Sequence, residues 1–169
     1  MRSIAVALFV LFSTAFANAQ EIAGQAVVTD GDTIEIRGIK IRLWGIDAVE
    51  SKQLCWDAAS NVRQCGRIAA NAVAEMIGRR VVSCLPVSLD RDRRIVGRCS
   101  VNGHDLSEVI VRYGYAIDYV RYSNGAYAQS QELARSTKSG NWQYAWQYPE
   151  NFRACMKIRG ANIRSCSQQ

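Results

Sequence analysis

The sequence predicts an α+β protein, a small five-stranded β-barrel with about three α-helices. Three observations favour this class. Apolar residues alternate with the period of a strand in five short segments, and the period lengthens to that of a helix in others. The strand–helix–strand rhythm of a parallel sheet does not recur along the chain.

The first three strands are expected between Gly24 and Asp47. Apolar residues there alternate with polar ones, and two groups of turn residues interrupt them, Asp30-Gly31-Asp32 and Gly38. The alternating apolar residues are Ala26, Val28, Ile34, Ile36, Ile39, Ile41 and Leu43. This pattern predicts an antiparallel meander with one buried face.

The rest of the chain alternates helices with two more strands. A helix is expected over residues 66–80, then strands at Val81–Leu89 and Ile95–Val101, joined by the charged loop 90–94. Asp105 should cap a second helix, with Glu108 at capping-box spacing and Gly114 at its end. The apolar face of that helix would be Leu106, Val109, Ile110 and Tyr113.

A third helix is expected from about Ala126 to Ser139, with Leu133 and Ala134 facing inward. The aromatic segment after Trp142 is expected to be irregular. Five short strands with interleaved helices predict an OB-type barrel. We expect one domain over residues 20–169.

Residues 1–19 have the three parts of a secretory signal peptide. Arg2 gives a positive start, an apolar run from Ile4 to Phe16 follows, and Ala17-Asn18-Ala19 supplies small residues at a cleavage site. The run is shorter than the ~20 residues that a membrane span needs. We therefore expect cleavage after Ala19 and a secreted or periplasmic protein that does not remain in the membrane.

Six cysteines behind such a segment predict three disulfides. Pairing of sequence neighbours gives Cys55–Cys65, Cys84–Cys99 and Cys155–Cys166. Zinc is the competing interpretation, but the chain has no C-x-x-C pair and His104 is its only histidine. The formal net charge of +6 is compatible with a polyanionic partner and is also common on other proteins.

Two segments carry residues suited to phosphodiester chemistry. Asp32 and Asp47 lie at the ends of strands that can be neighbours, so their carboxylates can converge into the oxygen site that calcium prefers. Glu50 follows closely and could accept a proton from a water. Arg42 lies on the strand face opposite Ile41 and can hold a phosphate. Each segment alone is equally compatible with a turn or a solvated edge strand.

Together, three segments resemble the signatures of the staphylococcal nuclease family. They are Thr29-Asp30-Gly31-Asp32-Thr33-Ile34, then Ile41-Arg42-Leu43 with Gly45-Ile46-Asp47-Ala48-Val49-Glu50, and finally Asp90 to Cys99. Gly114-Tyr115-Ala116, Tyr119 to Ser123 and Gly140-Asn141-Trp142 are similar to the family's helical half. The resemblance extends over roughly residues 24–142.

The resemblance implies a calcium-dependent endonuclease with an OB-fold barrel, acting on DNA and RNA, and we expect a monomer. By position, Arg42, Glu50 and Arg94 would be the catalytic residues, with Glu50 as general base. Asp32 and Asp47 would ligate calcium through carboxylates and Ala48 through its carbonyl, supported by Asp30 and Thr33. Further substrate contacts would come from Arg91, Tyr119 and Tyr122.

Three positions depart from the family pattern. Val49 replaces a proline before Glu50, and Asp92-Arg93 replaces Tyr-Gly before the second arginine. Two alternatives therefore stay open: a weakened OB module that binds nucleic acid without cleaving it, and a secreted calcium-binding domain that has lost nuclease activity. Retention of acidic residues beside the phosphate-binding arginines favours the enzyme, because simple binding does not need them.

Overall fold

The computed structural model describes residues 20–168, so the predicted signal peptide lies outside the described residues. Five strands form the predicted barrel: β1 (Ile22–Asp30), β2 (Thr33–Ile36), β3 (Ile39–Leu43), β7 (Val81–Leu89) and β8 (Ile95–Val101). They pair in the order β3-β2-β1-β7-β8, and a parallel pairing of β3 with β8 closes the ring. The α+β barrel prediction is confirmed, and the strand bounds lie close to those expected from the alternation.

The registers explain which side chains fill the barrel. Ile34 on β2 is opposite Ile41 on β3, and Ile41 is in turn opposite Ile95 on β8. Ile34, Ile36, Ile41 and Leu43 are almost completely buried. Burial of a large aliphatic side chain stabilises a fold by roughly 1.5–3 kcal/mol. The alternating residues of the meander thus supply much of the core.

Short strands add two smaller sheets and a hairpin at the edge. β4 (Ile46–Ala48) pairs with β10 (Ala116–Asp118), and β5 (Cys55–Trp56) pairs with β6 (Val62–Arg63). β9 (His104–Asp105) extends the barrel sheet beside β8, and its His104 is exposed. The sequence pattern did not predict these strands because two or three residues are too few to show a period.

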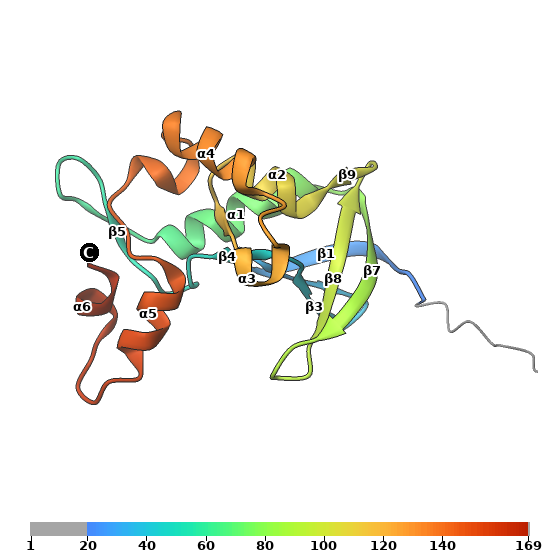
Figure 1. Ribbon diagram of the computed structural model, residues 1–169, viewed down its shortest axis with the longest axis horizontal. Coiled ribbons are helices and arrows are strands. Elements are labelled where there is room, and N and C mark those ends of the chain that lie inside the picture. Colours follow the sequence, from blue (N-terminus) through green and yellow to red (C-terminus); the bar gives the residue numbers. More distant parts are fainter. Residues whose placement is uncertain (1–19, 169) are drawn as a thin grey trace, which may run out of the picture.

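Helix α1 (Cys65–Ile77) is inserted between the third and fourth barrel strands of the chain, and α2 (Leu106–Arg112), α3 (Val120–Ser123) and α4 (Ala128–Ser136) come after the last one. Figure 1 shows these helices beside the barrel. α1 ends at Ile77, three residues before the predicted boundary, and is followed by the C-cap Gly78, whose φ of 56° suits glycine. Asp105 caps α2 as predicted, accepting hydrogen bonds from the backbone amides of Ser107 and Glu108.

Two predicted apolar faces need correction. Tyr113 at the end of α2 is 56% exposed, and Val111 is buried instead. Leu133 on α4 is 42% exposed, while Ala134 beside it is buried as predicted. The predicted third helix corresponds to α4, which lies within the predicted range, whereas the short helix α3 before it was not predicted. Asn124, in the left-handed conformation, and Gly125 separate α3 from α4.

The prediction of an irregular tail is wrong. After the 3₁₀ turn η1 (Gly140–Gln143), the chain forms α5 (Pro149–Met156) and α6 (Ile163–Ser167). Pro149 occupies the first turn of α5, and Asn162 forms a capping box with Ser165 at the start of α6. The described residues therefore contain six α-helices instead of about three. We call α5, α6 and the loop between them, residues 149–167, the C-terminal hairpin.

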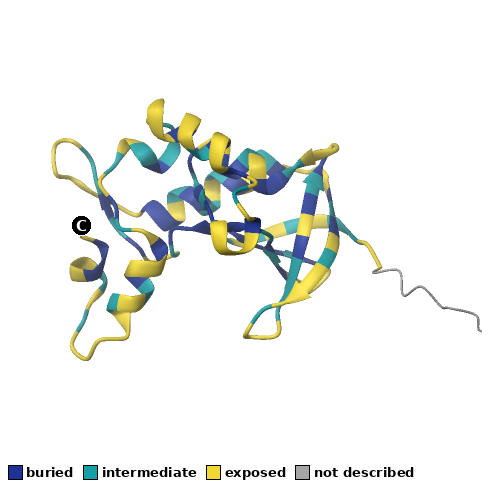
Figure 2. Cartoon of the chain, viewed as in Figure 1, coloured by how far each residue is buried: buried dark blue, intermediate teal, exposed yellow. Residues whose placement is uncertain are grey.

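The hydrophobic core has two clusters, and Figure 2 shows buried residues on the barrel strands and on the helices beside them. The larger cluster fills the barrel and extends to the faces of α1 and α2 that pack against it. The smaller one contains Val49, Cys55, Cys65, Ala69 and Trp146, so it joins the segment around Glu50 to α1 and to the chain just before the C-terminal hairpin. None of the helices in residues 20–168 has the length and apolar character needed to cross a bilayer.

All three predicted disulfides are present: Cys55–Cys65, Cys84–Cys99 and Cys155–Cys166. Cys84 and Cys99 are directly opposite each other on β7 and β8. The other two pairs tie α1 to β5 and α5 to α6. Each bridge joins two cysteines that are consecutive along the chain, because the two elements that carry them are adjacent in the fold.

Replacement of both Cys84 and Cys99 by Ala should lower the free energy of unfolding by about 3 kcal/mol, because the bridge closes a loop of moderate length in the unfolded chain. Urea unfolding followed by circular dichroism measures this. The control is Ser83→Ala with Ser100→Ala, at the next cross-strand pair. It should change stability by no more than about 0.5 kcal/mol. Equal stability of the two double variants would contradict the prediction.

Candidate active site

Arg42 brings together two buried carboxylates from different elements. Its Nη2 lies 2.9 Å from Asp32 Oδ2 and 3.0 Å from Asp47 Oδ1. Asp32 occupies the turn between β1 and β2, and Asp47 is the central residue of β4. Both acids are at most 6% exposed. The predicted convergence of the two carboxylates is therefore present in the structure, and Arg42 faces them.

Neighbouring groups fix the Asp32 side chain. Thr33 Oγ1 donates to Asp32 Oδ1 at 2.9 Å, and the backbone amide of Ala48 lies 3.4 Å from Oδ2. The Asp32 carbonyl accepts from the Leu43 amide at 2.8 Å. Thr33 thus has the supporting position expected for it, and Ala48 lies beside the carboxylates.

Asp30 lies beside the two carboxylates at the end of β1. Its pKa is raised to about 6, first by burial and then by the negative charges of Asp32 and, to a smaller extent, Glu50. Its Oδ1 accepts from the Gly31 amide, and that hydrogen bond only partly offsets the increase. The raised pKa therefore reflects mainly the burial of Asp30, with a smaller contribution from the neighbouring acids.

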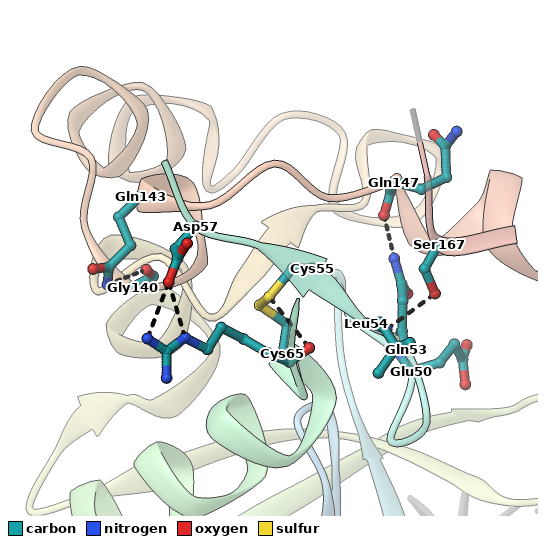
Figure 3. Close-up of a disulfide and its surroundings, with 11 residues drawn as sticks. Glu50, Gln53, Leu54, Cys55, Asp57, Cys65, Gly140, Gln143, Gln147 and Ser167 are labelled. Carbon is teal, nitrogen blue, oxygen red and sulfur yellow. Dashed lines mark hydrogen bonds and ion pairs between the residues drawn. A yellow bond between two sulfur atoms is a disulfide. The ribbon is translucent and has the colours of Figure 1, made fainter. Parts of the chain in front are cut away.

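Glu50 lies in a tight turn that follows β4. Gln53 is fully buried, and its backbone N–H donates to the Glu50 carbonyl at 2.7 Å. Its side-chain Oε1 accepts from the backbone N–H of Glu50 at 3.2 Å. The Gln53 Nε2 donates to the carbonyl of Gln147, as Figure 3 shows. Gly66 at the start of α1 packs against the same turn, because a Cβ there would lie 1.9 Å from the Glu50 carbonyl oxygen.

The β7–β8 loop places Arg94 in the lining of the cavity that also contains Arg42 and Glu50. Asp90 Oδ1 accepts from the amides of Asp92 and Arg94, and its Oδ2 pairs with Arg94 Nε at 2.7 Å. Burial alone would raise the pKa of Asp90, but these hydrogen bonds lower it. Arg93 has a φ of 60° and does not line the cavity. The four-residue spacing from Asp90 to Arg94 thus corresponds to a local hydrogen-bonded turn.

A cavity of about 420 Å³ lies between these elements. Every sequence-predicted site residue except Asp47 lines it, and Asp47, 1% exposed, lies directly behind Arg42. Tyr119 and Tyr122 pack edge to face on one side, with ring centroids 4.9 Å apart. The predicted residues in the lining are Asp30, Asp32, Thr33, Arg42, Ala48, Glu50, Arg91, Arg94, Tyr119 and Tyr122.

Arg153 of α5 also lines the cavity, and the sequence analysis missed it. Its Nη1 lies 3.0 Å from Asp47 Oδ1 and 2.7 Å from Glu50 Oε1, while its Nη2 lies 2.7 Å from Asp47 Oδ2. Burial alone would lower the pKa of Arg153, but the bonds to Asp47 and Glu50 raise it, so the group remains charged. Pro149 followed by Glu150 could have predicted α5, but no pattern indicated that its arginine faces Asp47.

The oxygens of Asp32 and Asp47 are hard donors of the kind that calcium takes. Their convergence on Arg42 suits a single cation between them. In this arrangement, however, both Asp47 oxygens accept from guanidinium groups. No cluster of three or more His, Cys, Asp or Glu side chains with metal-binding geometry occurs among residues 20–168. The donor chemistry fits a cation, but Arg153 would have to leave Asp47, and Arg42 Nη2, which lies between the two acids, would have to shift.

The sequence profile of staphylococcal nuclease homologues matches residues 40–144, more than half of the chain. The chain belongs to the staphylococcal nuclease family. The matched range includes Arg42, Asp47, Glu50 and Arg94 and ends before α5. Arg153 is therefore outside the part of the chain by which the staphylococcal nuclease family is recognised.

Three curated proteins are similar to this staphylococcal nuclease homologue. Succinoglycan biosynthesis protein ExoI of Rhizobium meliloti (strain 1021) is 37% identical over 145 residues, covering 84% of this chain and 76% of that protein. Staphylococcal-like nuclease CAN1 of Arabidopsis thaliana is 30% identical, covering 68% of this chain and 34% of that protein. Probable staphylococcal-like nuclease CAN4 of Oryza sativa subsp. japonica is 25% identical, covering 79% and 26%. The chain thus spans about a third or less of the two plant nucleases.

Gly66→Ala should destabilise this family member and move Glu50. Alanine gains up to ~1 kcal/mol over glycine inside a helix, but the added Cβ would overlap the Glu50 carbonyl, and overpacking costs about 1–3 kcal/mol. We expect a net loss of stability in thermal unfolding. Arg67→Ala, at the next and exposed position of α1, is the control and should be near neutral. A higher melting temperature for Gly66→Ala would contradict this prediction and show that the turn at Glu50 can move without loss of stability.

Proposed function

We propose that this chain is a secreted or periplasmic, calcium-dependent endonuclease that hydrolyses phosphodiester bonds of DNA and RNA. The observation that carries the proposal is the common cavity of Arg42, Arg94 and Glu50 beside the paired carboxylates of Asp32 and Asp47. Membership of the staphylococcal nuclease family supports it, as do the names of the two plant relatives.

The proposed reaction is attack of water on phosphorus. Glu50 Oε1 and Oε2 belong to a side chain that is 30% exposed, so water can reach the carboxylate. Glu50 takes the proton of the attacking water as general base. A well-placed base contributes about 10²–10⁴ in rate. The double hydrogen bond between Glu50 and Gln53 holds the backbone from which this carboxylate extends.

Arg42 and Arg94 bind the phosphate and stabilise the charge that gathers on its nonbridging oxygens. Their side chains are 21% and 33% exposed, so each guanidinium keeps donors available toward the cavity. Such interactions accelerate a reaction because they strengthen as the transition state forms. Asp90 orients Arg94, and Asp32 with Asp47 orients Arg42.

Asp32, Asp47 and the carbonyl of Ala48 would hold calcium, which when bound supplies further positive charge next to the phosphate. Tyr119, Tyr122 and Arg91 line the same cavity and would contact the nucleotides on either side. Aromatic side chains stack on bases with little sequence preference, which suits an enzyme acting on both DNA and RNA.

A second candidate is an OB module that binds nucleic acid without cleaving it. The contact between Arg153 and Glu50 favours this alternative, because Oε1 of the proposed base already accepts a hydrogen bond and is less available to a water. Asp92 in place of the family's tyrosine also removes one aromatic contact. Cleavage assays separate the two candidates.

Purified protein comprising residues 20–169 should cleave plasmid DNA and RNA when calcium is present. EGTA should abolish cleavage, and added calcium should restore it, since Asp32 and Asp47 offer oxygen ligands only. Glu50→Gln is the control for contaminating nucleases and should reduce the rate by about 10²–10⁴. Binding to labelled DNA without cleavage would support the second candidate, and full activity in EGTA would exclude calcium dependence.

Arg94→Ala should lower kcat by about 10²–10³, the effect of losing one positioned electrostatic donor. Arg93→Ala is the matched control, because Arg93 is adjacent in sequence but does not line the cavity. Its activity should stay within a few-fold of the unchanged protein. If Arg93→Ala were the crippling change, the assignment of Arg94 would have to be withdrawn, whereas Arg42 and Glu50 would be unaffected.

A further inference from the structure

Arg153 occupies the acceptor atoms around which the proposed calcium site is built. It takes both oxygens of Asp47 and Oε1 of Glu50, at 2.7–3.0 Å. Two parallel N–H···O bonds to one carboxylate form the strongest geometry available to an arginine. Asp47 is 1% exposed, so water does not compete for it.

The C-terminal hairpin is hydrogen-bonded to the segment that follows Glu50, and these bonds hold Arg153 beside Asp47 and Glu50. Leu54 donates from its amide to Ser167 Oγ at 3.0 Å, and Gln53 donates to the carbonyl of Gln147 just before α5, as seen in Figure 3. The Cys155–Cys166 bridge, two residues beyond Arg153, fastens α5 to α6. Both ends of the hairpin are thus fixed beside the active site.

A guanidinium and a divalent cation cannot share these oxygens. Each Asp47 oxygen already accepts from Arg153, and Oδ1 also accepts from Arg42. A cation bound there would lie within a few ångströms of the Arg153 charge, where like charges repel strongly in a site screened from water.

We propose that Arg153 and a divalent cation compete for the Asp47 carboxylate, so that the C-terminal hairpin sets the metal affinity of the site. This inference rests on the calcium site of the proposed function. Arg153 would have to leave Asp47 for a cation to bind there, and the same movement would free Glu50 Oε1 to act on water. The hairpin therefore restrains the enzyme when calcium is scarce. Arg153 is a positioning and competing residue, and its effect is on the occupancy of the site.

The test is calcium titration by isothermal calorimetry on residues 20–169, with nucleic acid left out. Arg153→Gln removes the charge while keeping a side chain able to hydrogen bond. We expect its calcium dissociation constant to fall at least about fivefold, the lower end of couplings between interacting sites. Calcium should also raise its melting temperature more than that of the unchanged protein, because tighter binding stabilises the folded state more.

Arg159→Gln is the matched control. It makes the same charge change in the same hairpin, at an exposed residue in the loop between α5 and α6, and its calcium affinity should be unchanged. Arg153→Lys keeps the charge but loses the two parallel bonds, so its affinity should fall between those of Arg153→Gln and the unchanged protein. It also provides a folded comparison if circular dichroism shows that the glutamine variant is unfolded.

Unchanged or weaker calcium binding by Arg153→Gln would overturn the proposal, and weaker binding would show that Arg153 instead holds Asp47 in place for the metal. If Arg159→Gln gained as much calcium affinity as Arg153→Gln, the change in net charge would explain the effect, and the proposal would again be overturned. Failure to bind calcium in every variant would also exclude competition. The titration is independent of cleavage, so an absence of nuclease activity alongside tighter binding by Arg153→Gln would refute the enzyme proposal alone.

Discussion

The active site depends on the pairing of Arg42 with two buried acids, Asp32 and Asp47. Removing a carboxylate from water costs several kcal/mol unless hydrogen bonds and opposite charge compensate, and Asp32 and Asp47 are each at most 6% exposed. Arg42 reaches both because the β2–β3 register sets it opposite Thr33, the residue after Asp32. Asp47 arrives separately, through the pairing of β4 with β10. The registers of these two strand pairs therefore determine where the three side chains meet.

The remaining functional groups are attached to this centre from outside the barrel. The Glu50 turn lies between the Gly66 end of α1 and the buried side chain of Gln53, and the smaller core around Val49 and Trp146 supports it. Val49, in place of the family's proline, is 2% exposed and packs in that core. Packing and hydrogen bonds therefore hold the turn that a proline would otherwise stiffen. This compensation depends on residues up to Gln147, beyond the range matched to the family.

The sequence predicted the parts of this protein whose signals are local. Alternation located β1, β2, β3, β7 and β8, and neighbouring cysteines identified the three disulfides, because hairpin strands and short loops keep sequence neighbours in contact. The segments around Asp32, Arg42 and Glu50 predicted the site residues, because they resemble the signatures of the staphylococcal nuclease family. They could not reveal Arg153, whose partner Asp47 is 106 residues away and whose helix is only eight residues long. Contacts across such a separation depend on how the C-terminal hairpin docks, and no period in the sequence encodes that.

The acids of the site gather at one end, and this gathering explains how one cavity can suit both a cation and a phosphate. Asp30, Asp32, Asp47 and Glu50, which we call the acidic half, come from the end of β1, the β1–β2 turn and the β4 segment. The β7–β8 loop contributes Arg91 and Arg94 together with Asp90 and Asp92, so the charges that it adds to the cavity lining balance. Two guanidinium groups, those of Arg42 and Arg153, form ion pairs with carboxylates of the acidic half, and a doubly charged ion gains more there than a single guanidinium can. Arg153 holds the acidic half together in the absence of such an ion. Displacing it from Asp47 is therefore part of the energetic cost of binding a cation at this site.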